Sequence, residues 1–219
     1  MSDFIHLHNH THYSILDAIP TPKELIEAAV TDNQTAIALT DHGVMFGAIE
    51  FYKECLAKKI KPIIGCEVYI ANGSRLEKDA GKTKKKNYYH LLLLAKNKIG
   101  YHNLMKLSSI GHTEGFYYRP RIDKETLKQY SEGLICTSAC MSGIVAFYLR
   151  ANQYETAKKE AEFYKELFKD DFYIEIQNHF LPDDAIILRD APKIAKELDI
   201  KIVATNDIHY IKKEDAIAH

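Results

Sequence analysis

Two kinds of segment alternate along this chain. Short runs rich in isoleucine, valine, leucine and aromatic residues predict strands, and most stretches between them carry apolar residues at helical spacing. The seven predicted strands cover residues 4–10, 36–40, 61–70, 88–95, 134–138, 172–178 and 201–206. This alternation is typical of an α/β fold with a mostly parallel sheet. Seven units favour a closed or nearly closed barrel, with a doubly wound open sheet as the alternative.

The segments between the strands predict helices with recognisable ends. Thr21 is a candidate cap before Pro22, Gly111 ends one helix, and Asp123 caps a shorter one. The predicted helices cover residues 22–30, 46–59, 99–111, 124–130, 142–168 (two helices broken near 151–152) and 184–198, where Pro192 predicts a kink. The lysine-rich stretch at residues 75–86 predicts a solvated surface loop, with contact to a DNA backbone as the alternative.

Composition limits the class of protein. The 219 residues, 46% hydrophobic and 27% charged, suffice for one sizeable core, so we expect a single domain. The 29 Lys and Arg against 30 Asp and Glu give a net charge of −1, so any contact with phosphates must be local. Four cysteines without a CxxC pair, no signal peptide and no apolar run of about 18 residues predict a cytoplasmic protein.

Residues able to bind metal close or follow most of the predicted strands. They are His8 and His10, Asp41 and His42, Glu67, Cys140, the run Gln177-Asn178-His179, and Asp207 with His209. His90 is the exception, because it begins its apolar run. Active sites of barrels and of doubly wound sheets lie at the carboxyl ends of the strands. We therefore expect these side chains to gather in one site.

The residue types at these positions indicate a metal centre. The nine candidate ligands are His8, His10, Asp17, His42, Glu67, His90, Cys140, Asp207 and His209. Imidazole with carboxylate suits Zn, Mn or Fe, and a thiolate shifts the preference toward Zn. At about four ligands per ion, this set implies two or three ions, an arrangement found in many phosphoesterases, in which a metal-bound water attacks phosphorus.

Other chemistries have less support. The sequence contains no phosphate-binding loop, no nucleophile elbow and no dinucleotide-binding fingerprint. A nucleophilic pair of Cys140 with a histidine would leave the carboxylates unexplained.

At HLHNHTHYSILD, TDHG, GCEVYI, the His-Leu of YYHLLLLAK, TSAC and NDIHY, the chain resembles the PHP (polymerase and histidinol phosphatase) superfamily. Between these motifs, GFYYRPRID, FYIEIQNH and IVATNDIHYIKKEDAIAH resemble the amino-terminal PHP domain of bacterial DNA polymerase III alpha subunits. The resemblance covers essentially the whole chain. It implies a distorted seven-stranded, TIM-like βα barrel with a trinuclear metal site.

The family pattern also implies how the ligands divide. His8, His10, Glu67 and Asp207 would hold the first ion, Glu67, His90 and Cys140 the second, and Asp17, His42 and His209 the third. PHP domains with the full set are associated with metal-dependent 3′–5′ exonuclease proofreading. In that reading Asp207, Glu67 and His209 act through metal-bound water.

Several polar residues allow two interpretations. Arg119 and Arg121 are candidates for binding substrate phosphate or for ion pairs that support their loop. Asp41 is expected to orient a ligand imidazole or to cap the turn before Gly43, and His179 to touch substrate or to bond at the strand end. We expect His6 to be packed in the core, His12 to lie at the rim, Cys66 to face the packing, and His102, His112 and His219 to be surface residues.

These features predict a metal-dependent phosphodiesterase that removes nucleotides from a DNA 3′ end. The expected partners are the DNA 3′ end, the remainder of the polymerase and a separate proofreading subunit. Because the chain stops within an expected helix that begins near Lys212, we expect a fragment of a longer polymerase. The alternatives are a metal-binding structural module without catalysis and a free-standing phosphomonoesterase of the histidinol phosphatase kind.

Overall fold

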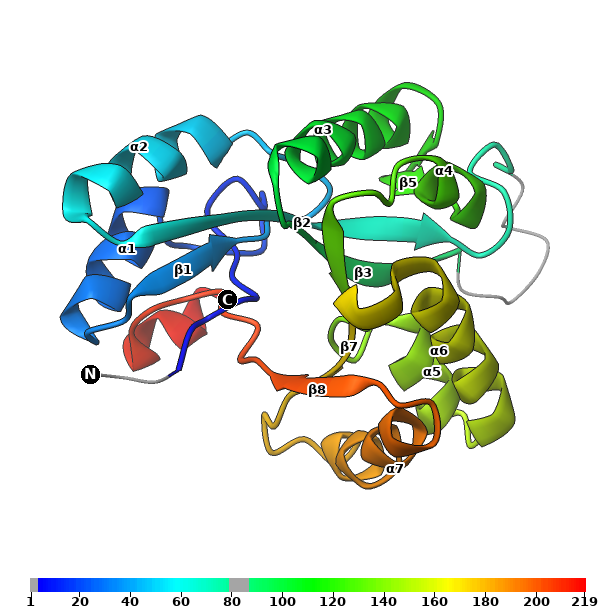
Figure 1. Ribbon diagram of the computed structural model, residues 1–219. Coiled ribbons are helices and arrows are strands. Elements are labelled where there is room, and N and C mark those ends of the chain that lie inside the picture. The colour runs from blue at the N-terminus through cyan, green and yellow to red at the C-terminus, as the bar shows by residue number, and fades with distance from the viewer. Residues whose placement is uncertain (1–3, 79–86) are drawn as a thin grey trace.

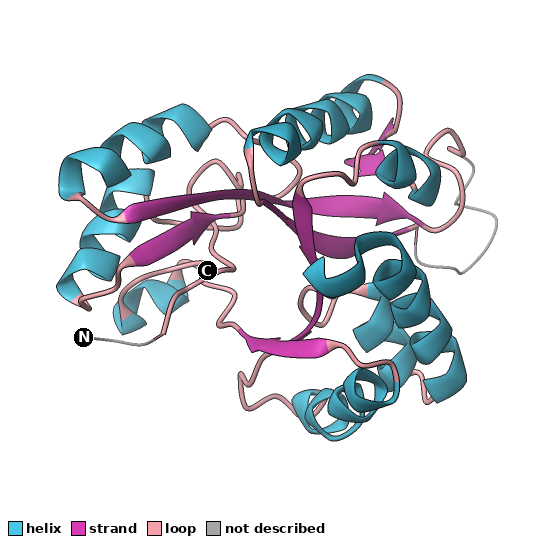
Figure 2. Ribbon diagram, viewed as in Figure 1, coloured by secondary structure: helices cyan, strands magenta, loops and turns pink. Residues whose placement is uncertain are grey.

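A curled sheet surrounded by helices forms the fold (Figures 1 and 2). The computed structural model describes residues 4–78 and 87–219. The strands are β1 (Ala36–Leu39), β2 (Lys61–Ala71), β3 (Tyr88–Ala95), β4 (Phe116–Tyr117), β5 (Arg119–Ile122), β6 (Leu134–Thr137), β7 (Phe172–Ile176) and β8 (Lys201–Ala204). The helices lie outside the curl, which agrees with the predicted distorted barrel.

The strand order is β4-β5-β2-β3-β6-β7-β8, and β1 also pairs with β2. The long strand β2 has two neighbours on one side, because its first half pairs with β1 and its last residues pair with β5. The short β4–β5 hairpin was not predicted. The expectation of a mostly parallel sheet needs a correction at β3, which runs antiparallel to both β2 and β6.

The first predicted strand, residues 4–10, is wrong as a regular strand. The segment has no strand assignment and one isolated bridge, between Asn9 and Ile208, while the backbone N–H groups of Ala38 and Thr40 donate to the His6 and Asn9 carbonyls. The Asn9 side chain donates to the carbonyls of His6 and Ala38, and the Thr40 hydroxyl bonds the Asn9 backbone. These side-chain bonds add to the backbone bonds, and the segment fills the gap between β1 and the chain after β8.

The helices follow their predicted start and stop signals. They are α1 (Pro22–Thr31), α2 (Ala48–Lys58), α3 (Lys98–Thr113), α4 (Lys124–Gln129), α5 (Ile144–Arg150), α6 (Tyr154–Phe168) and α7 (Asp184–Glu197). Thr21 and Asp123 form capping boxes, and Asn152, with φ = +56°, breaks α5 from α6. The helix expected near Lys212 is a short 3₁₀ turn, Lys213–Ile217, preceded along the chain by another, Lys169–Asp171.

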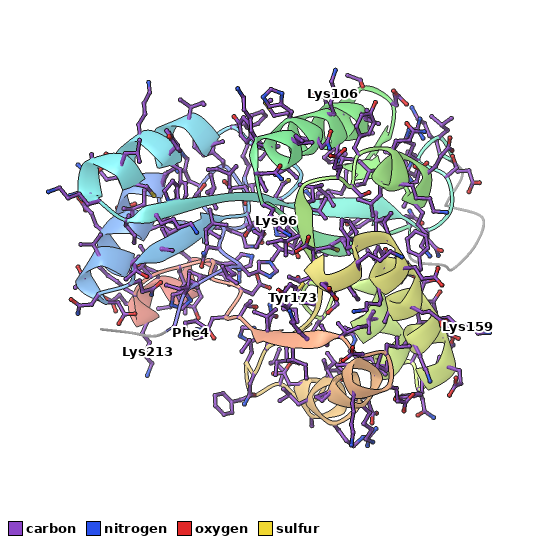
Figure 3. The ribbon with its side chains drawn as sticks, viewed as in Figure 1. Phe4, Lys96, Lys106, Lys159, Tyr173 and Lys213 are labelled. Atoms are coloured by element: carbon purple, nitrogen blue, oxygen red, sulfur yellow. The ribbon has the colours of Figure 1, made fainter. Side chains whose placement is uncertain are left out.

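The apolar core lies between the sheet and the helices. On β2, Cys66, Val68 and Ile70 are buried against α3 and the helices that follow, as expected for Cys66. A second cluster lies under α1 and α2 and includes Phe51. Because side chains alternate along a strand, Glu67 points to the opposite face, inside the curl. Figure 3 shows helix lysines such as Lys106 at the outer surface.

The predicted loop at residues 75–86 lies only partly within the described chain, because residues 79–86 are outside it. Its first residues are described: Arg75 donates to Asp123 and to Glu114. Within residues 4–78 and 87–219, no helix has the length and apolar character needed to cross a membrane.

Candidate metal centre

Glu67 on β2 is the carboxylate around which the predicted ligands gather. It is fully buried. Its Oε1 lies 3.4 Å from His8 Nε2 and 3.0 Å from His90 Nδ1. Its Oε2 lies 3.4 Å from His10 Nε2 and 2.8 Å from His42 Nδ1. One carboxylate therefore connects candidate ligands from the N-terminal segment, the turn after β1 and strand β3.

Asp207 faces the two N-terminal histidines from the other side. Its Oδ1 lies 3.2 Å from His8 Nε2 and 3.1 Å from His10 Nε2. Asp207 follows β8 in the left-handed region of backbone space, at φ = +50°, which is uncommon for a residue other than glycine. His8, His10 and Asp207 offer ligand atoms within 4.8 Å of one another, which suits a single ion.

Asp17 joins two further histidines. Its Oδ2 lies 2.8 Å from His42 Nε2 and 3.2 Å from His209 Nε2. The His10 ring stacks on the His42 ring, with centroids 4.1 Å apart, and lies 4.4 Å from the His209 ring. This group therefore borders the one formed by His8, His10 and Asp207.

His90 and Cys140 complete the set. The Cys140 Sγ lies 3.6 Å from Glu67 Oε1 and 3.9 Å from His90 Nδ1. His90 reaches this site although it begins its strand, because β3 runs antiparallel and its first residues lie beside the carboxyl ends of its neighbours. All nine candidate ligands therefore lie together at one end of the curled sheet.

The donor set fits divalent metal. Within the described residues, His8 Nε2, His42 Nδ1 and Glu67 Oε2 are buried and make no well-aligned hydrogen bond, although His42 Nδ1 and Glu67 Oε2 lie 2.8 Å apart. An unpartnered buried polar atom costs about 1–3 kcal/mol. A cation among these atoms would satisfy all three, and imidazole, carboxylate and thiol side chains are the ligands of zinc and similar metals.

The charges of the site favour cations. Burial opposes ionisation of Glu67, but the charges of His90, His8 and His42 outweigh it, so the pKa of Glu67 lies well below its usual range. Burial also opposes protonation of His42, yet Glu67 and Asp17 raise the pKa of His42 to about 9, so a cation bound there would displace a proton from this ring. Burial lowers the pKa of His10 to about 3, which leaves its imidazole in the neutral form that binds metals.

Glu175 on β7 supports this site and was missed by the sequence analysis. Its Oε1 lies 2.6 Å from His8 Nδ1, and the hydroxyls of Thr137 and Thr205 and the amide of Gln177 also donate to it. Every one of these groups is buried. Alternation along β7, which puts Glu175 and Gln177 on the same face, was the available signal.

Within the described residues, Asp41 makes no hydrogen bond to an imidazole, and the Gly43 backbone N–H donates to the Glu67 carbonyl and not to Asp41, so neither interpretation of it holds as stated. Its carboxylate accepts from the Thr11 backbone and hydroxyl and from the Ser14 hydroxyl. The Ser14 Oγ lies 3.4 Å from His10 Nδ1. Asp41 therefore anchors the histidine-rich segment and reaches His10 only through Ser14.

The two candidate arginines, Arg119 and Arg121, lie in different environments. Arg121 is buried, and its Nε and Nη2 donate to the carbonyls of Gly115, Arg75 and Glu77. It supports the loops and does not line the cleft above the metal centre, so the expected phosphate contact does not fit. Arg119 does line that cleft, 5.6 Å from the centre of the Tyr69 ring.

The cleft above the metal centre has a volume of about 700 Å³. His112 and His219, expected as ordinary surface residues, both line it. His112 bonds the Gly43 carbonyl, and the His219 ring lies 4.7 Å from the His209 ring. His179 lies elsewhere and bonds Gln177, as a residue at a strand end does.

The fold and the ligand cluster together indicate the protein family to which the chain belongs. A family model described as "PHP domain" matches residues 6–179. The chain therefore belongs to the PHP domain family, and the predicted resemblance is confirmed.

Comparison with curated proteins shows which kind of protein within this family the chain resembles. The chain is 50% identical to the DNA polymerase III subunit alpha of Borreliella burgdorferi over 99% of its length, and 42% identical to that of Aquifex aeolicus over 99%. It covers 19% of each of these relatives, so it spans about a fifth of their length. The predicted similarity to this polymerase subunit is therefore also confirmed.

Solved structures confirm the fold. An amidohydrolase from Chromobacterium violaceum matches with a TM-score of 0.52 at 15% identity, over 96% of this chain and 89% of that one. A two-domain protein from Bacteroides vulgatus, described as containing a PHP-like metal-dependent phosphoesterase, matches with a TM-score of 0.56 at 16% identity, over 96% and 53%. At these identities the likeness concerns the fold alone.

Proposed function

We propose that this chain is a metal-dependent phosphodiesterase that removes nucleotides from the 3′ end of DNA. The observation that carries the proposal is the clustering of the nine candidate ligands, with Glu67 at its centre and three buried ligand atoms that make no well-aligned hydrogen bond among the described residues. The similarity to polymerase alpha subunits supports DNA as the substrate.

Two or three divalent ions, Zn or Mn with Fe as a further option, would be held in this cluster. The contacts support His8, His10, Glu67 and Asp207 as one ligand set. Glu67, His90 and Cys140 would make a second set and Asp17, His42 and His209 a third, which their contacts allow. Glu67 would bridge ions, since its two oxygens face different sets.

When bound, the ions would supply a water activated for attack on phosphorus and would neutralise charge on the phosphate. The protein residues hold this arrangement. Asp207 and Glu67 fix the two N-terminal histidines from opposite sides. His209 lies beside Asp207 at the floor of the cleft. Arg119 lies on the cleft wall, within reach of a phosphate group.

The polymerase context belongs to the same proposal. We propose that residues 1–219 form a single PHP domain that works as part of a longer replicative polymerase alpha subunit. Its partners would be the remainder of that subunit and a separate proofreading subunit. A structural module would share the metal centre without hydrolysis, and a phosphomonoesterase would act on small phosphate esters.

Digestion of a 5′-labelled primer–template with a mismatched 3′ end tests the function. The chain is loaded with Zn or Mn and compared with chelator-treated protein and with Asp207→Asn. Asp170→Asn, at an exposed site, is the matched control. We expect a ladder from the 3′ end that disappears with chelator and with Asp207→Asn, and persists with Asp170→Asn.

Two results would contradict the proposal. If metal analysis finds two or three ions per chain and the DNA stays intact, the structural role is favoured. If a small phosphate monoester is hydrolysed while DNA is not, the phosphomonoesterase is favoured.

A further inference from the structure

Exposed aromatic side chains gather around the mouth of the cleft. Six aromatic residues of the described chain count as exposed: Phe4, Phe46, Tyr52, Phe116, Tyr118 and Phe180. Three of the six, Phe46, Phe116 and Tyr118, line the cleft above the metal centre, and we call these three the aromatic rim. They are 66%, 51% and 77% exposed, so at least half of each of these apolar residues is open to solvent.

The β4–β5 hairpin that carries two of these rings is firmly held. Tyr118 lies at its tip with φ = +59°, a conformation that is unfavourable for an aromatic residue. The buried Arg121 fastens the hairpin to the loop at Arg75 and Glu77. On the other side, the hairpin residue Pro120 packs against Gly43. The rim is therefore presented by a fixed element and not by a loose loop.

A cation accompanies the rings. Among the described residues that line the cleft, Arg119 is the only lysine or arginine, and it directly follows Tyr118. It lies over the Tyr69 ring at 5.6 Å and is itself exposed. Aromatic faces beside one fixed cation match a single nucleic-acid strand, whose bases stack on rings and whose phosphates pair with arginine.

We propose that the aromatic rim stacks the last unpaired bases of a DNA strand, with Arg119 beside their phosphates, and thereby guides the 3′ end into the metal centre. This inference rests on the proposed function and names the form of DNA that the site takes. Bases paired within a duplex do not expose their faces, and a blunt end offers only the outer face of its last pair, so a blunt duplex would engage the rim far less than an unpaired tail. A small phosphate ester would reach the metal centre but leave the rim uncovered.

The test is a binding measurement that does not require hydrolysis. Metal-loaded chain is titrated with labelled DNA that carries phosphorothioate linkages at its 3′ end, as a duplex with a three-nucleotide unpaired 3′ tail or as a blunt duplex. The variants are Phe116→Ala and Tyr118→Ala, with Tyr118→Phe, which keeps the ring. Tyr52→Ala removes an exposed aromatic residue outside the cleft and is the matched control.

We expect the tailed duplex to bind at least tenfold more tightly than the blunt duplex. Phe116→Ala and Tyr118→Ala should each weaken binding of the tail about tenfold, because each removes a ring on which a base stacks. Tyr118→Phe and Tyr52→Ala should bind like the unchanged chain. A 2-aminopurine base in the tail should change its fluorescence on binding, and this change should be smaller in Tyr118→Ala.

Equal affinity for tailed and blunt DNA, or unchanged affinity in both alanine variants, would contradict the proposal that the aromatic rim stacks unpaired bases. Hydrolysis of DNA together with either result would leave the proposed function intact and remove only the rim. Selective binding of the tailed duplex, with no hydrolysis whichever metal is loaded, would support the rim and contradict the proposed hydrolytic function. The two proposals therefore fail by different measurements.

Discussion

Glu175 Oε1 lies 2.6 Å from the Nδ1 of His8, and both side chains are fully enclosed. With Nδ1 donating to Glu175, the opposite ring nitrogen, Nε2, points at Glu67 and Asp207. Burial opposes protonation of His8, but the neighbouring carboxylates outweigh it and raise the pKa of His8 well above its usual value, so a cation bound at Nε2 would take the place of a proton. Carboxylates that hold a histidine in this way fix its tautomer and orientation and raise its basicity. Glu175 is therefore a positioning residue for the metal centre.

Glu175→Gln should lower the affinity of the chain for Zn about 10–100-fold, because the neutral amide neither fixes the tautomer nor raises the basicity of His8. Competition with a chromophoric chelator measures the affinity. Glu166→Gln, at an exposed site, should have no effect. An unchanged affinity in Glu175→Gln would show that the Glu175–His8 contact serves only packing.

Cys140→Ser tests thiolate ligation. Burial raises the pKa of the Cys140 thiol well above its usual range, so only a bound cation would deprotonate it at neutral pH. Chain loaded with Co²⁺ should show a sulfur-to-metal charge-transfer band in the near ultraviolet, and Cys140→Ser should lose it. Cys55→Ser, which alters a thiol buried under α2, should retain the band. A band that survives in Cys140→Ser would exclude this ligand.

Gly43→Ala should destabilise the fold by about 1–3 kcal/mol. Gly43 has φ = +66°, and a Cβ there would approach the Pro120 Cγ to 2.7 Å. Thermal unfolding measures the loss. Pro120→Ala in the same chain should recover the part that comes from the steric contact, whereas the part from the backbone conformation should persist. A double variant no more stable than Gly43→Ala would show that the contact adds nothing.

Asp123→Asn should reduce the sensitivity of the fold to acid. Burial acts to raise the pKa of Asp123, but hydrogen bonds from the Arg75 and Thr126 backbones outweigh it, so the pKa lies below its usual value. A carboxyl with a lowered pKa stabilises the fold above its unfolded pKa of about 4, and this stability is lost as the pH falls through the folded pKa. Asparagine keeps the helix cap but does not titrate.

Urea unfolding at pH 7 and at steps below pH 4 measures the difference. The unchanged chain should lose more stability than Asp123→Asn over this range, and Asp170→Asn serves as the exposed control. Parallel losses in all three proteins would contradict the prediction.

Local sequence signals predicted much of this fold. The caps at Thr21 and Asp123 and the break near Asn152 occur as expected, because each depends on a few neighbouring residues. Six of the seven predicted strands are present. The antiparallel direction of β3 was not predictable in this way, since strand direction depends on long-range pairing.

The gathering of the candidate ligands was predicted better than the contacts around them. All nine candidate ligands lie together, including His90, whose position at the start of its run looked anomalous. Contacts that depend on tertiary structure were missed. Glu175 looks like an ordinary strand residue until His8 lies opposite it, and Arg121 looks like a phosphate ligand until the carbonyls around it are seen.

The bridge between Asn9 and Ile208 bears on when the metal centre is completed during folding. His10 and Asp207 contact each other across 197 positions of sequence, one of the longest loop closures that a chain of this length allows. Contacts of such high sequence separation are slow to form, because closing a long loop costs conformational entropy. During synthesis the histidine-rich segment emerges first and must wait for β8 before it meets Asp207. Tight metal capture would then mark the end of folding, and a chain halted before β8 would hold its ions loosely.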